Sequence, residues 1–445
     1  MNKNPHDFMG TQNITSLLFK LSIPAMIGMI SNALYNVIDA VFVGHGAGAL
    51  AIGGLTIAFP FQLIIGAFAL MFGVGVASVI SRKLGERNPE EAVNAAANAF
   101  ILTIIISILI LIFGEIFLNK ILLIFGATED ILPFATNYMR IILLGAPFLS
   151  FSMCASNVLR SEGSAKIAMN IMIIGTGLNI ILDPIFIFGL KMGISGAAIA
   201  TVISQIVGSM YGLLYFLKGK SSLKFKISSF KLKIKYIKEI VLLGLATFIR
   251  QIGTSVMALA VNNMVKIYGG DLAIAAFGIV NRLLTLVLMP IFGMNQGLQP
   301  IIGYNYGAKQ YDRVHKALKV AIIITTLIGF VFALFAFIFP TVLIKMFTTD
   351  TRLLDISVVA LRIIMSTMVL LGIQSCGTTY FQALGKSVPS ILLGMSRQFI
   401  ILIPLVLLLP RFFGLTGVWL AFPLADIIAS SITVIWLLVD IKKYK

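Results

Sequence analysis

Apolar runs of about 20 to 30 residues recur along the whole chain, and each is long enough to cross a hydrocarbon core of about 30 Å as an α-helix. The runs 99–117 and 391–409 are apolar nearly all round. Strands of a membrane barrel would instead alternate apolar and polar residues. Because a backbone in lipid must satisfy its own hydrogen bonds, the sequence predicts a bundle of membrane-spanning helices.

Turn signals and clusters of charged residues divide the apolar sequence into twelve predicted spans. They cover residues 14–44, 52–82, 92–125, 130–158, 165–190, 194–217, 237–267, 274–304, 314–347, 351–383, 388–410 and 415–440.

The second half of the sequence repeats the first. A shift of about 222 residues aligns Gly75 with Gly297 and Arg140 with Arg362. Six spans are an even number, so both copies have one orientation in the bilayer, related by an axis along the membrane normal. We therefore predict an all-α polytopic membrane protein of two parallel six-helix repeats around a central cavity. Its predicted parts are an N-terminal lobe (1–217), a cytoplasmic basic linker (218–236) and a C-terminal lobe (237–445).

The excess of positive charge is concentrated in the loops, above all in one segment near the middle of the sequence. The formal net charge is +17, and eight lysines lie between residues 218 and 238. Other basic residues follow alternate spans, as the positive-inside rule describes for cytoplasmic loops. This pattern favours a loop that faces anionic lipid over a nucleic-acid site. We expect an inner-membrane or plasma-membrane protein with both termini cytoplasmic and no nucleic-acid partner.

Acidic residues inside the spans are functional candidates, because placing an ionisable group in mid-membrane costs at least about 2.5–3.5 kcal/mol of insertion free energy. Asp39 lies in the first span, with Tyr35 one helical turn before it. Asp183 lies in the fifth span, with Asn179 in the same relation. Pro184 has no N–H, so it frees a backbone carbonyl one turn from the second acid. Two acids, an amide, a phenol and a free carbonyl suit a proton or a small cation.

The same acids would also be stable as structural groups, bonded to neighbouring helices or paired with a buried arginine. The candidate arginines are Arg140, Arg250, Arg282 and Arg397. The second repeat has Val261 in place of the first acid and Pro404 close to the place of the second. A purely architectural pair would be expected in both repeats, so the asymmetry favours a specialised first half.

Other polar or unusual residues in the spans are further candidates. Thr201 and Gln205, four residues apart, form a polar stripe on the sixth span. Pro24 interrupts the first span as a hinge or as a static bend. Asp426 lies in the last span, where a place in the cavity and a buried ion pair are equal alternatives. The 33 phenylalanines and 19 methionines would let a cavity accept varied lipophilic cations.

Five short segments carry a resemblance to a known family. They are Leu21–Ala25, Tyr35–Asp39, Arg160–Gly163, Asn179–Pro184 and Gly196–Thr201. With these segments the chain resembles multidrug and toxic compound extrusion (MATE) transporters over essentially its whole length. Within that family it is most similar to the branch of DinF-like and MepA-like bacterial exporters.

The resemblance implies a two-lobed antiporter that exports small lipophilic cations and drugs in exchange for inward H⁺ or Na⁺. We also expect a monomer that needs no cofactor. It places the coupling site in the first lobe, and Pro24 matches the family's bending proline. The residues that carry over are Tyr35, Asp39, Tyr138, Asn179, Asp183 and Thr201, with Asn157 as a further candidate. If Na⁺ is the coupling ion, its ligands would come from Asp39, Asn179 and Asp183.

Two other functions remain as alternatives. A flippase for a lipid or a lipid-linked oligosaccharide would need basic residues that hold phosphate, such as Arg250, Arg282 and Arg397. An intramembrane enzyme fits less well, because the sequence has no His/Glu metal motif, no Asp-rich diphosphate motif and no nucleophile elbow. We therefore predict a transporter and not an enzyme.

Overall fold

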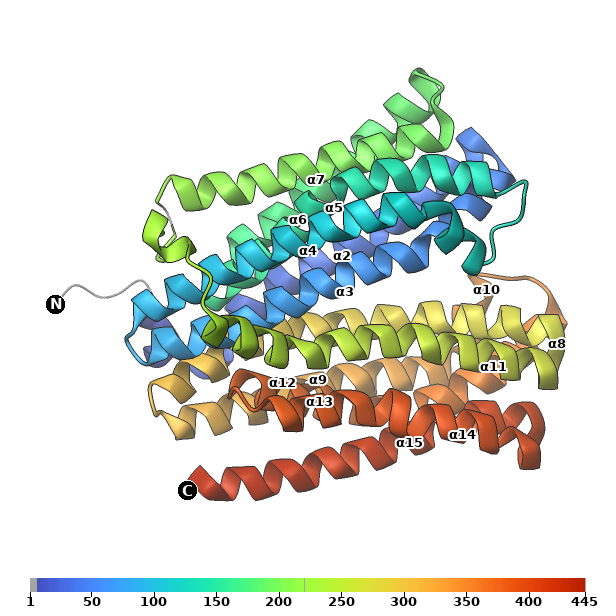
Figure 1. Cartoon of the computed structure of the whole chain (residues 1–445). Coiled ribbons are helices and arrows are strands. Elements are labelled where there is room, and N and C mark those ends of the chain that lie inside the picture. Colours follow the sequence, from blue (N-terminus) through green and yellow to red (C-terminus); the bar gives the residue numbers. More distant parts are fainter. Residues whose placement is uncertain (1–5, 220, 445) are drawn as a thin grey trace.

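The computed structural model describes residues 6–219 and 221–444, and helices make up nearly all of this part (Figure 1). The elements of the first half are α1 (Phe8–Thr11), α2 (Ile14–Ala47), α3 (Ala49–Gly85), α4 (Pro89–Ile124), α5 (Leu132–Ser161), α6 (Ala165–Pro184), η1 (Ile185–Gly189) and α7 (Gly193–Leu217). Side-chain caps mark where α2, α4 and α11 begin. For example, Asn88 Oδ1 accepts a hydrogen bond from the backbone N–H of Glu91 (3.2 Å), and Pro89 occupies the first turn of α4.

The short helix η2 (Ile227–Phe230) lies in the linker between the halves. The elements of the second half are α8 (Ile234–Gly307), α9 (Tyr311–Ile338), α10 (Pro340–Lys345), α11 (Thr351–Met365), α12 (Met368–Ala383), α13 (Ser387–Met395), η3 (Ser396–Leu402), α14 (Ile403–Leu408), α15 (Pro410–Ile441) and η4 (Lys442–Tyr444).

Two glycines divide what would otherwise be continuous helices. Gly270 has φ 67° and ψ −166°, a conformation that other residues rarely adopt. The chain turns back there, so α8 consists of two arms, 234–269 and 271–307. Gly414, with φ 55°, breaks α15 in the same way near its start. Both breaks coincide with loops between predicted spans.

The number of spans agrees with the prediction. Ten helices are long and apolar enough to cross a membrane, and α11 and α12, which are bent by 47° at their junction, form an eleventh span. When both arms of α8 are counted, the described part of the chain contains twelve spans.

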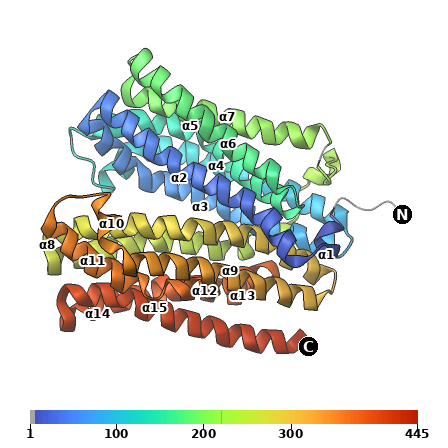
Figure 2. The same cartoon turned by 180° about the vertical axis from the view of Figure 1, so that it is seen from behind.

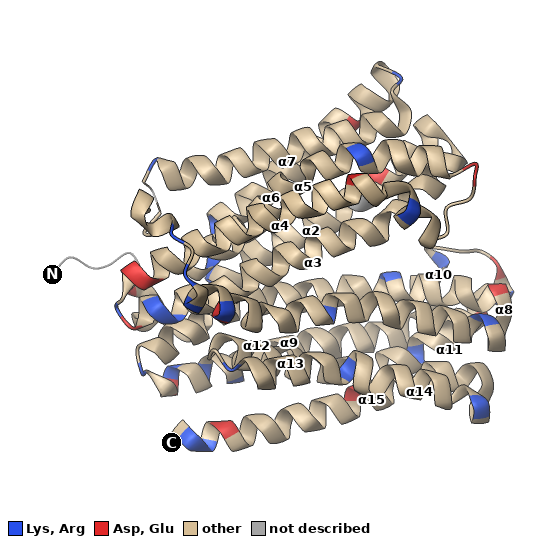
Figure 3. Ribbon diagram, viewed as in Figure 1, with Lys and Arg blue, Asp and Glu red and all other residues tan. Residues whose placement is uncertain are grey.

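Helices α2–α7 pack as one half and α8–α15 as the other, and the two halves lie side by side (Figures 1 and 2). The described chain begins and ends at the same end of the bundle, which we call the terminal end. Lysines and arginines gather at the terminal end, although several also lie along the helices and at the opposite end (Figure 3).

Three apolar clusters form the core. One lies entirely within the first half, from Val43 to Ala198, and one entirely within the second half, from Met257 to Ala429. The third joins the halves: it includes Val76 and Ile80 of α3 together with Leu298 of α8. The shared part of the core therefore lies near the terminal end, where these stretches of α3 and α8 meet.

Glycines allow α3 and α8 to approach closely across this junction. A Cβ atom on Gly75 would overlap the backbone carbonyl of Ile240, and one on Gly244 would overlap the carbonyl of Met71. Gly85 and Gly307 are related in the same way nearer the ends of the two helices. We call Gly75, Gly85, Gly244 and Gly307 the glycine seam. Only residues without a side chain permit this backbone contact.

Candidate functional site

Three helices of the first half bring polar side chains together. Tyr35 and Asp39 come from α2, Asn179 and Asp183 from α6, and Thr201 from α7. The Nδ2 group of Asn179 donates hydrogen bonds to Asp183 Oδ1 and to Thr201 Oγ1, both at 3.2 Å. The side chain of Tyr35 also lies next to that of Thr201. Thr201 therefore connects α2, α6 and α7, and we call these five residues the polar cluster.

The two carboxylates of the polar cluster are removed from solvent. Asp183 is fully buried and Asp39 is 7% exposed. The two groups lie close enough to interact electrostatically. Among the described residues, no lysine or arginine forms an ion pair with either acid: two of the candidate arginines pair elsewhere, Arg140 with Glu115 (2.9 Å) and Arg397 with Asp426 (2.6 Å). The structural alternative of an acid locked to an arginine thus does not apply to these two acids.

Tyr138 of α5 borders the polar cluster, within electrostatic range of Asp39, Tyr35 and Asp183. Its hydroxyl accepts a hydrogen bond from Gln62 Nε2 of α3 (3.0 Å). Gln62 was not predicted from the sequence. The only available signal was that a single amide stands in the apolar run of α3, without a polar partner at helical spacing.

Several oxygen atoms of the polar cluster have no hydrogen-bond donor in the described part of the chain. They are Asp39 Oδ1, Asn179 Oδ1 and Asp183 Oδ2, and all three are buried. A buried acceptor without a donor costs free energy, and a bound proton, water or cation would remove that cost. Oxygen atoms are also the ligands that hard cations prefer. The donor set therefore fits either H⁺ or Na⁺.

The backbone after Asp183 departs from a regular α-helix. Pro184 ends α6, and η1 continues the chain as a single π-helical stretch. Proline cannot donate to the carbonyl of Ile180, which leaves that oxygen without its usual α-helical partner. π-Helical turns are frequent at functional sites. This irregularity places a second kind of polar group, a backbone carbonyl, one turn from the acid.

Three other predicted residues lie outside the network of hydrogen bonds. Asn157 Nδ2 donates to the carbonyl of Met153 in its own helix (2.8 Å). Gln205 is next to Gly145 of α5, and its Oε1 atom has no donor among the described residues. Pro24 is buried inside α2, which continues as one helix on both sides of it. Its role as a hinge stays a prediction.

Asp426 lies in the second half, apart from the polar cluster. It accepts hydrogen bonds from Arg397 Nε (2.6 Å) and from Thr367 Oγ1 (2.9 Å). Of the two alternatives for Asp426, the buried ion pair is the one that the structure contains. The pair also neutralises one of the three arginines that a flippase would need for phosphate.

The chain is similar over nearly its whole length to known membrane transporters. The MatE family model matches twice, at residues 24–185 and 246–408. Multidrug export protein MepA of Staphylococcus aureus (strain MRSA252) is 27% identical over 425 residues, which are 95% of this chain and 94% of that protein. The protein of the same name from Staphylococcus haemolyticus (strain JCSC1435) is also 27% identical, over 94% of this chain and 92% of its own length.

Solved structures agree with the sequence relatives. One is described as the outward-facing conformation of a multidrug resistance MATE family transporter of the MOP superfamily, and another as MATE in the bent conformation. Each is 28% identical to this chain and has a TM-score of 0.94. Each alignment covers all of this chain and 99% of the solved one. These relatives are transporters and not enzymes. The two matches of the family model cover well over half of the sequence, so the chain belongs to the MatE family of membrane transporters.

Proposed function

We propose that this protein is a secondary antiporter that exports organic cations and drugs in exchange for H⁺ or Na⁺. The observation that carries the proposal is the pair of buried carboxylates, Asp39 and Asp183, whose acceptor oxygens lack donors among the described residues. The names of the relatives, multidrug export protein MepA, support the export of drugs.

The polar cluster would bind and release a proton or Na⁺, which neutralises the negative charge of its carboxylates. Two ionised carboxylates in a buried site repel one another, and a proton or Na⁺ on either of them relieves that repulsion. A proton on Asp183 Oδ2 would turn an acceptor into a donor, whereas Na⁺ would use the oxygens as ligands. Because Asn179 and Thr201 join α6 to α7 and α2, either event would change how these helices pack. We propose that this change favours substrate release on the outer side.

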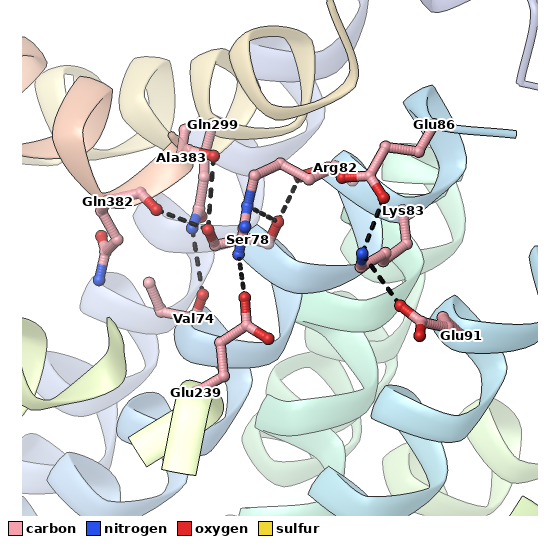
Figure 4. Close-up of polar contacts among 11 residues, drawn as sticks. Val74, Ser78, Arg82, Lys83, Glu86, Glu91, Glu239, Gln299, Gln382 and Ala383 are labelled. Atoms are coloured by element: carbon pink, nitrogen blue, oxygen red, sulfur yellow. Dashed lines mark hydrogen bonds and ion pairs between the residues drawn. The ribbon is translucent and has the colours of Figure 1, made fainter. Parts of the chain in front are cut away.

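Alternating access requires one end of the bundle to be closed in each state. We propose that the terminal end is cytoplasmic, because most of the basic loops lie there. Several contacts between the halves support a closed terminal end (Figure 4). Arg82 of α3 pairs with Glu239 of α8 (2.8 Å). Ser78 donates to the carbonyl of Gln382 (2.5 Å), and Gln299 donates to a carbonyl of α3 (3.1 Å).

In the transport cycle, the two lobes would move relative to each other as units. We propose lobes of residues 1–217 and 237–445, joined by a linker at 218–236. Opening the terminal end would separate the glycine seam and the ion pair between Arg82 and Glu239.

Transport in proteoliposomes tests the coupling site. Efflux of a fluorescent lipophilic cation would be measured under a pH gradient and, separately, under a sodium gradient. We expect Asp39→Asn and Asp183→Asn to lose most gradient-driven transport, since an amide can neither bind a proton nor supply a charged ligand. Asp355→Asn, an exposed acid on α11, is the matched control and should transport normally. Full gradient-driven transport in both site variants would refute the assignment.

A further inference from the structure

The linker between the halves has an unusual alternation of charge and apolar character. Eight lysines and no acidic residue lie between residues 218 and 238. From residue 223 onward the lysines alternate with leucine, isoleucine and aromatic residues. A merely soluble tether would not need these large apolar side chains.

The start of the linker is fixed to the first half. The carboxylate of Glu162, in the turn between α5 and α6, accepts hydrogen bonds from Ser221 Oγ (2.6 Å), Ser222 N (3.0 Å) and Ser222 Oγ (2.7 Å). The ring of Phe225 packs against the rings of Phe100 in α4 (5.9 Å between centroids) and Phe216 in α7 (5.6 Å).

The end of the linker is fixed as well. Asn98 of α4 donates to the carbonyl of Lys231 (3.1 Å) and accepts from the backbone N–H of Lys233 (2.8 Å). Lys235, in the first turn of α8, pairs with Glu91 of α4 (3.0 Å). The linker is therefore a strap held at several points, and its outward-facing side chains have a defined position.

The side chains that the strap presents outward are both apolar and basic. Ile227 is 95% exposed and Ile234 is 84% exposed, and Phe230 and Leu232 are also exposed. Within the described part of the chain, none of the lysines at 226, 231 and 238 takes part in an ion pair. Apolar side chains between lysines are typical of segments that lie in the interface of a membrane with anionic lipid.

The strap runs along the flank of α4, from the end of α7 to the start of α8, at the terminal end of the bundle (Figure 1). Beside its end lies a groove of about 220 Å³ in the second half. Its polar lining residues are Lys235, Lys238, Glu239 and Ser387, and its apolar ones include Leu242 and Leu243. The lysines come from the first turns of α8 and the leucines from one turn farther along it. Lys235 is paired with Glu91 and Glu239 with Arg82, so Lys238 supplies the charge of the groove that has no ion-pair partner among the described residues. A phosphate group next to Lys238 and an acyl chain along the leucines would match this order.

We propose that the strap and the groove bind anionic phospholipids of the inner leaflet. The headgroup phosphates would contact the unpaired lysines, and the exposed isoleucines would insert at the level of the first acyl carbons. The site rests on the proposed orientation of the terminal end. It does not depend on the coupling ion or on the polar cluster, so its test is independent of transport.

Binding to delipidated protein tests the site directly. Native mass spectrometry would compare the occupancy by phosphatidylglycerol with that by phosphatidylcholine. Each lysine near an anionic surface contributes a factor of about five to binding. The triple variant Lys226→Gln/Lys231→Gln/Lys238→Gln should therefore lose phosphatidylglycerol affinity by up to about 100-fold. The matched control replaces three exposed lysines of the opposite end: Lys120→Gln/Lys191→Gln/Lys345→Gln.

We expect the control to retain phosphatidylglycerol binding and inorganic phosphate not to compete for it. An equal loss in both triple variants would overturn the site, because the effect would then follow net charge alone. Competition by millimolar phosphate would instead indicate a site for the free anion, and it would overturn the assignment to lipid.

Insertion of the apolar side chains has its own readout. Both native cysteines, Cys154 and Cys376, are fully buried, so an environment-sensitive fluorophore would label Ile227→Cys selectively. In nanodiscs that contain phosphatidylglycerol its emission should shift to shorter wavelength relative to detergent, and the shift should be smaller in phosphatidylcholine. A water-like emission in all three environments would contradict the proposal.

Discussion

Substitution of a single glycine should change the balance between the two conformations of the proposed transport cycle. In Gly75→Ala, the added Cβ atom would overlap the carbonyl oxygen of Ile240, so α3 and α8 would have to move apart. Overpacking of this kind costs about 1–3 kcal/mol. The helix propensity gained by alanine is present in both conformations and cancels between them. The cost therefore applies only while the terminal end is closed.

This difference in free energy corresponds to a change of about 5- to 160-fold in the equilibrium between closed and open forms. Gly244→Ala, which would meet the carbonyl of Met71, should act in the same direction. The control is Gly66→Ala on the same helix, because no atom lies within 4 Å of its added Cβ. The control should leave the equilibrium unchanged.

Spin labels on exposed residues of opposite halves at the terminal end measure the equilibrium. Glu90→Cys and Lys309→Cys provide such a pair. Pulsed dipolar spectroscopy should show a larger long-distance population in Gly75→Ala than in the parent or in Gly66→Ala. If folded Gly75→Ala keeps the distance distribution of the parent, then the contact is not specific to the closed state, and our reasoning about the glycine seam is wrong.

Four further variants have defined expectations. Glu239→Gln removes a partly exposed ion pair with Arg82, so it should favour the open form by only about 0.2–1 kcal/mol, and less at high salt, as measured with the same labels. Asp426→Asn leaves the charge of Arg397 buried and unpaired, which should lower stability by about 3–5 kcal/mol in a thermal unfolding assay. The double change Arg397→Met/Asp426→Leu should recover most of that loss, and no recovery would argue against a simple ion pair. Glu162→Gln weakens the charge-assisted bonds to the strap, so trypsin should cut the linker faster than in the parent, and an unchanged rate would contradict the attachment.

The spans could be predicted from the sequence because length and hydropathy alone determine which segments cross a membrane. The relation of Asn179 to Asp183 was also predictable, since residues four apart share one face of a helix. Tyr35 shows the limit of that rule. Its spacing places it near Asp39, with which it interacts electrostatically, but the spacing could not show that its long side chain also reaches Thr201 of another helix.

Contacts between helices that are distant in the sequence could not be predicted. The arrangement of α3 against α5, which brings Gln62 to Tyr138, has no signal in the periodicity of either helix. For the same reason the sequence left Asp426 between two alternatives, because it does not say which neighbour faces the acid. The glycine seam also depends on which helices cross and at what depth.

The distribution of the apolar clusters has a consequence for biosynthesis. One cluster belongs wholly to the first half and is complete before the ribosome reaches α8, and another belongs wholly to the second half. Only the shared cluster requires both halves. Each half can therefore reach its own tertiary packing in the bilayer, and assembly ends with the docking of two preformed units. Halves expressed as separate polypeptides should meet through the same contact.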